Sequence, residues 1–96
     1  MHNLTGFQRD LLTVIAGHTK PSGQDIKTEL ETHLGDINHG RLYPNLDTLV
    51  EMQLVEKGAI DRRTNYYTIT DAGRNALVEY ANWRESYHAE VTSPML

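Results

Sequence analysis

Residues 41–73 constrain the fold more than any other part of the chain. Their first half carries apolar side chains at the spacing of one buried helix face: Leu42, Leu46, Leu49 and Val50. Two strand-like stretches follow, at residues 54–60 and 65–70, and the polar sequence Asp-Arg-Arg-Thr separates them. This pattern predicts a helix and then a two-stranded hairpin, with two adjacent arginines at the hairpin turn.

Two helices are predicted before this unit, each from a capping box at its start. In the first, over residues 5–18, Thr5 and Gln8 have the spacing at which the hydroxyl accepts from a backbone amide and the carboxamide reaches back. In the second, about three turns long, Ser22 and Asp25 repeat that spacing. Both segments continue with apolar residues at helical spacing, so each is expected to bury one face.

The two later helices are expected to begin differently. Asn38 suits the N-cap of the leucine-bearing helix, but Pro44, about five residues in, lacks an N–H group and its ring crowds the preceding turn. We therefore expect irregular backbone near residues 38–42. The last helix is expected to begin at Thr70, a good N-cap, and to continue to about residue 91.

The resulting order, three helices, a hairpin and a fourth helix, predicts a mainly α domain with a small β-hairpin, the winged helix-turn-helix architecture. A chain of 96 residues forms one domain with one modest core. No apolar run reaches the roughly 18 residues needed to span a bilayer. The N-terminus also lacks the basic and apolar segments of a secretory signal, so we expect a cytoplasmic protein without membrane contact.

Polar side chains suited to DNA lie opposite the leucines and at the hairpin turn. Arg41 can contact guanine with two hydrogen bonds, and Asn45 suits adenine or phosphate. Arg62 and Arg63 at the turn can reach the minor groove or the phosphates. Each group alone is also common on solvated surfaces, and their coincidence favours DNA binding. The candidate DNA-contacting residues are Ser22, Gln24, His39, Arg41, Tyr43, Asn45, Thr48, Arg62, Arg63 and Asn65.

Net charge opposes that interpretation. The formal charge is -4, whereas a DNA-binding domain usually carries a basic stripe. The distribution of charge is uneven, however. Basic residues within the helix and hairpin unit or just after it are Arg41, Lys57, Arg62, Arg63 and Arg74, and acidic residues beyond it include Glu79, Glu85 and Glu90. A winged-helix module that binds other proteins and no DNA is the alternative hypothesis.

Several segments resemble the PadR family of winged-helix transcriptional regulators, in particular its short members from halophilic archaea. They are Gly40-Arg-Leu-Tyr-Pro-Asn-Leu-Asp-Thr-Leu-Val-Glu, Leu54-Val-Glu-Lys, Tyr66-Tyr-Thr-Ile-Thr and Ala72-Gly. The resemblance implies that the helix from about residue 39 is the recognition helix and that residues 61–65 form the wing tip. It also implies a homodimer acting at a palindromic operator, and we expect a stress-responsive repressor. Acidic surface helps to keep such a protein in solution at high salt.

The last helix presents more apolar and aromatic area than so small a core can cover, and such a surface is a liability in a monomer. We therefore predict a symmetric homodimer in which this helix packs against the last and first helices of the partner. The candidate dimer-interface residues are Phe7, Leu77, Tyr80, Ala81, Trp83, Arg84, Tyr87 and Val91. Residues 1–69 then form a DNA-binding core and residues 70–91 a C-terminal dimerisation helix within one domain of residues 1–96.

Enzymatic and cofactor-dependent functions are not expected. The sequence has no Gly-rich phosphate loop, nucleophile elbow or His-Glu-x-x-His pattern. It has no cysteine, which excludes disulfides and thiolate zinc sites in the chain itself, and His33 and His39 are isolated imidazoles. We expect no metal and no cofactor, and the partners are double-stranded DNA and a second copy of the chain. The sequence identifies no small-molecule effector.

Overall fold

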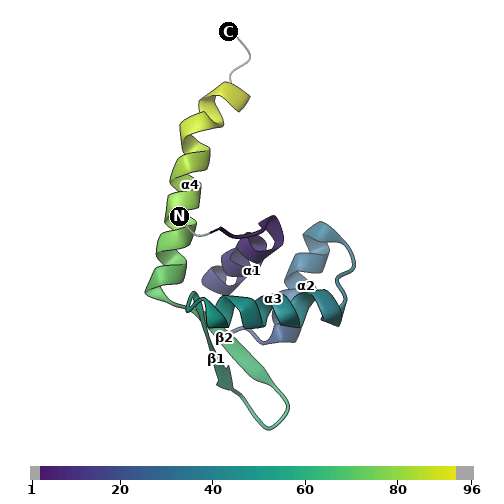
Figure 1. Ribbon diagram of the computed structural model, residues 1–96. Coiled ribbons are helices and arrows are strands. Elements are labelled where there is room, and N and C mark those ends of the chain that lie inside the picture. The colour runs from purple at the N-terminus through teal and green to yellow at the C-terminus, as the bar shows by residue number, and fades with distance from the viewer. Residues whose placement is uncertain (1–2, 93–96) are drawn as a thin grey trace.

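The computed structural model describes the backbone of residues 3–92 and the side chains of residues 3–88. The elements are α1 (Gly6–Gly17), α2 (Gly23–Leu34), α3 (His39–Glu51), β1 (Val55–Ala59), β2 (Asn65–Ile69) and α4 (Asp71–Thr92). In Figure 1, α1, α2 and α3 gather above the β1–β2 hairpin, and α4 extends away from them as a long arm. The predicted winged helix-turn-helix order is confirmed. Within residues 3–92, no helix is both long and apolar enough to cross a membrane.

The first two helices begin at the predicted capping boxes. At α1, Thr5 Oγ1 accepts a hydrogen bond from Gln8 N at 3.1 Å, and Gln8 Oε1 accepts one from Thr5 N at 3.1 Å. At α2, Ser22 and Asp25 make the same reciprocal pair, both at 3.0 Å. Each box satisfies two backbone donors that a helix start would otherwise leave without partners.

The expectation of an irregular start to α3 is wrong. The helix is regular from its first residue and keeps Pro44 inside it. Asn38 is the N-cap as predicted, and its carbonyl accepts from both Arg41 N at 3.2 Å and Leu42 N at 3.1 Å, so the first turn forms without a donor from Pro44. Complete burial of Leu42 and Leu46 in the core offsets the missing hydrogen bond of the proline.

One hydrophobic core joins the first three helices to the hairpin. Its most deeply buried members are Leu11, Leu12, Ile15, Ile26, Leu42, Leu46, Leu49, Leu54, Val55 and Tyr67. The strands β1 and β2 pair antiparallel, with Lys57 opposite Tyr67. The loop before α2 joins this sheet, because Pro21 O accepts from Tyr67 N at 2.9 Å and Ser22 bridges to Tyr66. The hairpin, which we call the wing, is thus attached to the helix-turn-helix through β2.

The start of α4 is set by its N-cap and by a close approach to the wing. Thr70 Oγ1 accepts from Gly73 N at 3.0 Å and donates to Gln53 O at 2.8 Å. Gly73 lies directly against the backbone carbonyl of Leu54, so a Cβ at this position would overlap the carbonyl oxygen. Residues 81–88, farther along α4, are all exposed. The first turns of α4 therefore fix the direction of an arm that leaves the core (Figure 1).

We expect Gly73→Ala to lower the free energy of unfolding by about 1–3 kcal/mol, since the new methyl group must displace backbone. Gly17→Ala is the matched control, because no atom lies within 4 Å of its Cβ position and alanine favours the helix. Urea unfolding followed by circular dichroism measures both variants. Equal stability of the two would contradict the close contact between α4 and the chain at Leu54.

Candidate nucleic-acid interface

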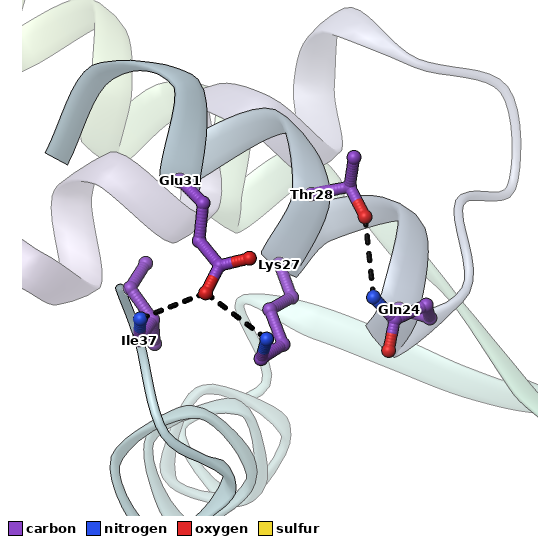
Figure 2. Close-up of polar contacts among 5 residues, drawn as sticks. All are labelled: Gln24, Lys27, Thr28, Glu31 and Ile37. Atoms are coloured by element: carbon purple, nitrogen blue, oxygen red, sulfur yellow. Dashed lines mark hydrogen bonds and ion pairs between the residues drawn. The ribbon is translucent and has the colours of Figure 1, made fainter. Parts of the chain in front are cut away.

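The turn between α2 and α3 is held by Glu31. Its Oε2 atom accepts from Lys27 Nζ at 3.0 Å and from the backbone N of Ile37 at 2.9 Å, as Figure 2 shows. These contacts hold the pKa of the Glu31 carboxyl below its usual range, with the Ile37 amide as the larger cause. The Ile37 side chain is buried. Charge and apolar burial together therefore fix how α3 follows α2.

A cleft of about 210 Å³ lies between the start of α2, the side of α3 and the wing. Its lining residues are Ser22, Gly23, Gln24, Tyr43, Arg63, Thr64, Asn65 and Tyr67. Ser22, Gln24, Tyr43, Arg63 and Asn65, predicted separately from the sequence, are thereby brought together. Three lining residues were missed: Gly23 and Thr64, each of which adjoins a predicted residue, and Tyr67, which the strand pattern placed in the sheet.

Tyr43 reaches from α3 to the first turn of α2. A Cβ on Gly23 would come within 2.7 Å of the Tyr43 hydroxyl, so glycine permits this approach. On the other side, the Tyr43 ring makes an edge contact with the His39 ring, with centroids 5.5 Å apart. The candidate Gln24, which follows Gly23 in α2, is exposed. Its Nε2 donates to Thr28 Oγ1 at 3.2 Å (Figure 2).

The wing tip is shaped by Asp61. Its Oδ1 atom accepts from the backbone N of Arg63 at 2.8 Å and of Thr64 at 2.9 Å. Both hydrogen bonds lower the pKa of the Asp61 carboxyl, and the Arg63 amide is the larger cause. Arg62 and Arg63 lie exposed beside it. The carboxylate thus orders the turn that presents the two arginines.

Two candidate residues of α3 lie against α1. The guanidinium carbon of Arg41 is 3.9 Å from the centroid of the Phe7 ring. Asn45 Oδ1 accepts from Gln8 Nε2 at 3.1 Å, and Asn45 Nδ2 donates to Arg41 O at 2.8 Å. The contact to Gln8 is not predictable from the sequence, where Gln8 is expected only to cap α1.

Other polar groups near the interface pair with one another. Thr48 Oγ1 donates to the carbonyl of Pro44 at 3.0 Å. Lys57 Nζ lies 3.8 Å from Asp47 Oδ1, so one basic residue of the wing sits beside an acidic residue of α3. The pair links β1 to α3 across the surface. The positive charge that the wing presents at its tip therefore comes from Arg62 and Arg63.

The first group of candidate dimer residues is covered within the subunit. Phe7 is only 8% exposed and belongs to the core, against which Leu77 packs half-buried. Tyr80 is half-buried, and the guanidinium carbon of Arg9 lies 4.2 Å from its ring centroid. Leu77 and Tyr80 line the groove between α1 and α4, and Phe7 adjoins its lining residue Gly6.

The second group lies on the arm of α4. Trp83 and Tyr87 are 51% and 53% exposed, and their ring centroids are 5.7 Å apart. Ala81 and Arg84 are exposed beside them. Val91 falls outside the residues whose side chains are described. An apolar and aromatic surface is thus displayed on α4 beyond its contact with the core.

Comparison with known proteins identifies the family. The sequence pattern of the transcriptional regulator PadR-like family matches residues 11–79, which include the second half of α1, all of α2, α3 and the wing, and the first turns of α4. The chain belongs to the PadR-like family of transcriptional regulators. It is therefore a DNA-binding regulator and not an enzyme. A comparison with curated proteins gave no match.

Solved structures agree with this assignment. One is a structure of RosR from H. salinarum that was grown from NaBr. RosR is 49% identical to this chain, the TM-score is 0.83, and the match covers 88% of this chain and 77% of RosR. The structure of a complex, RosR-S1, is 48% identical with a TM-score of 0.84, over 91% and 78% of the two chains. FabT of Streptococcus pneumoniae in complex with DNA is 16% identical with a TM-score of 0.74, over 98% and 64%, and shows likeness of fold alone.

Proposed function

We propose that this protein is a homodimeric repressor that binds a palindromic operator in double-stranded DNA through α3, the start of α2 and the wing. The observation that carries the proposal is the cleft in which the first turn of α2, Tyr43 and Arg63 converge. The N-terminal end of a helix attracts a phosphate, and an arginine nearby adds a charged donor. The cleft thus suits one phosphate of a DNA strand beside a groove that α3 enters.

In this proposal one part of the single domain contacts DNA and the other forms the dimer. Residues 1–69 contact DNA, with α3 in the major groove and Arg62 and Arg63 on the backbone or in the minor groove. Residues 70–91 join two subunits, which sets the spacing of the two recognition helices. The protein acts in the cytoplasm, where its operator is, and a response to stress belongs to the same proposal.

The acidic composition of the chain is compatible with DNA binding at high salt. In molar salt the Debye length is only about 3 Å, so long-range attraction between the wing and the phosphates is weak. Direct contacts, ions and bridging waters then supply more of the affinity. A formal charge of -4 is compatible with DNA binding under those conditions. We propose that the regulator works at high salt, as its similarity to RosR of H. salinarum suggests.

The arm of α4 supports the homodimer. Trp83 and Tyr87 are more than half exposed, and their ring centroids are 5.7 Å apart. A second copy of the arm offers the same apolar and aromatic surface, which suits a two-fold symmetric contact. Such a dimer places two recognition helices about one helical turn of DNA apart, roughly 34–36 Å. A palindromic operator follows from that symmetry.

The alternative is a winged-helix module that binds proteins and no DNA, and the negative net charge is the observation that favours it. Fluorescence anisotropy with a duplex from the region upstream of the protein's own gene separates the two functions. We expect saturable binding that is tighter than binding to a scrambled duplex. Equal and weak binding to both duplexes would favour the alternative.

Replacing Arg62 and Arg63 together with alanine should lower the affinity for operator and for random DNA by similar factors, because phosphate contacts carry little sequence information. The slope of log affinity against log salt should fall by about 2, one for each lost contact. Anisotropy titrations across a salt series measure both effects. Arg74→Ala, which removes an exposed arginine from α4, is the control and should change neither. A loss confined to the operator would mean that the wing reads bases.

Replacing Trp83 and Tyr87 together with glutamate should produce monomers, because each subunit would then place two negative charges at the two-fold contact. Operator affinity should fall sharply in the same variant, since only one recognition helix would bind. Sedimentation velocity and anisotropy measure the two effects. Leu34→Glu charges an apolar residue that is 48% exposed at the end of α2, and it should leave the dimer intact. An intact protein that sediments as a monomer at micromolar concentration would contradict the dimer.

A further inference from the structure

Resting on the proposed DNA-binding function, we propose that Gln8 of α1 is a positioning residue for DNA recognition, because it sets the orientation of the Asn45 carboxamide on α3. Gln8 lies 37 positions before Asn45 in the sequence, and the hydrogen bond between them is half-buried. Gln8 itself is not placed to read DNA in this role. It acts through the residue on the recognition helix.

The capping box dictates the polarity of this contact. Gln8 Oε1 accepts from Thr5 N at 3.1 Å, which is its part in capping α1. The other half of the carboxamide, Nε2, donates to Asn45 Oδ1 at 3.1 Å. A rotation that exchanged the two ends of the carboxamide would place an NH2 group against the Thr5 amide and lose both hydrogen bonds. Gln8 therefore presents a donor to α3.

Asn45 is oriented in turn. Its Oδ1 faces Gln8, and its Nδ2 donates to Arg41 O at 2.8 Å. Exchanging oxygen and nitrogen would set NH2 against NH2 on one side and oxygen against oxygen on the other. An amide oxygen has two lone pairs and an amide nitrogen two hydrogens, so each atom keeps one position for a base or phosphate. The donor and acceptor of Asn45 are thus arranged before DNA binds, which lowers the ordering cost of binding.

The neighbours of Gln8 support this role for the first turn of α1. The Phe7 ring lies under the guanidinium of Arg41 at 3.9 Å, so adjacent residues of α1 hold two neighbouring candidates of α3. Arg9, the next residue, lies over the Tyr80 ring of α4 at 4.2 Å. One helical turn therefore touches both the recognition helix and the helix proposed for dimerisation.

Gln8→Glu tests the polarity directly. Glutamate keeps an acceptor for the Thr5 amide and so keeps the capping box, but it places a carboxylate oxygen against Asn45 Oδ1. Asn45 must then turn over and oppose its oxygen to Arg41 O. The probes are a duplex that the intact protein selects from a random-sequence pool and a scrambled duplex of the same composition. We expect the ratio of the two affinities to fall on the order of fivefold or more, as for the loss of a base contact.

Two further variants separate positioning from stability. Thr5→Ala removes the hydroxyl of the capping box and leaves the Gln8 carboxamide in place, so it should lower the melting temperature without changing the affinity ratio. In an Asn45→Ala background, Gln8→Glu should cause no further fall in the ratio, because the residue through which it acts is gone.

The outcomes are distinguishable. An unchanged ratio in Gln8→Glu, or an equal fall in the presence and absence of Asn45, would overturn the role of Gln8 and leave the DNA-binding function standing. Failure of the intact protein to select any duplex would overturn the DNA-binding function and the role of Gln8 with it.

Discussion

The hydrogen bond from the Tyr67 amide to the Pro21 carbonyl, at 2.9 Å, decides where the wing stands relative to the helix-turn-helix. The Tyr67 ring is fully buried in the core, and this burial, with smaller effects of Asp47 and Tyr43, raises the pKa of its phenol. Backbone and side chain of one residue thus attach β2 to the loop before α2. This attachment brings β2 beside the start of α2, where Arg63 and Ser22 line the same cleft.

Much of the fold could be predicted from local patterns in the sequence. The contacts between residues far apart in the sequence could not. The starts of α1 and α2 followed from reciprocal bonds three residues apart, which a sequence displays directly. Pro44 misled the prediction of α3, since burial of the leucines on its opposite face outweighs the lost donor. Ser22, Tyr43 and Arg63 were predicted as candidates, but the sequence does not show that they line one cleft. The contact between Gln8 and Asn45 depends on how α1 crosses α3, and no spacing in the sequence encodes that.

The acidic composition opposes DNA binding less than the net charge of the chain suggests. Glu31 accepts from a backbone amide in the turn before α3, and Asp61 accepts from two in the wing. Asp47 lies near the ammonium group of Lys57. Carboxylates close to the candidate interface therefore order its turns by hydrogen bonding, and the exposed tip of the wing carries the two arginines. This arrangement fits a regulator whose affinity comes from matched contacts more than from long-range attraction.

Hydrogen–deuterium exchange of the intact protein, with and without a duplex from its own upstream region, tests most directly which face binds DNA. Exchange reports the opening and exposure of each backbone amide. We expect DNA to slow exchange at residues 61–65, at the first turn of α2 and along α3, and to leave the arm of α4 at its rate in the free dimer. Slower exchange confined to α4, with residues 61–65 unchanged, would contradict the assignment of α3 and the wing as the DNA-binding face.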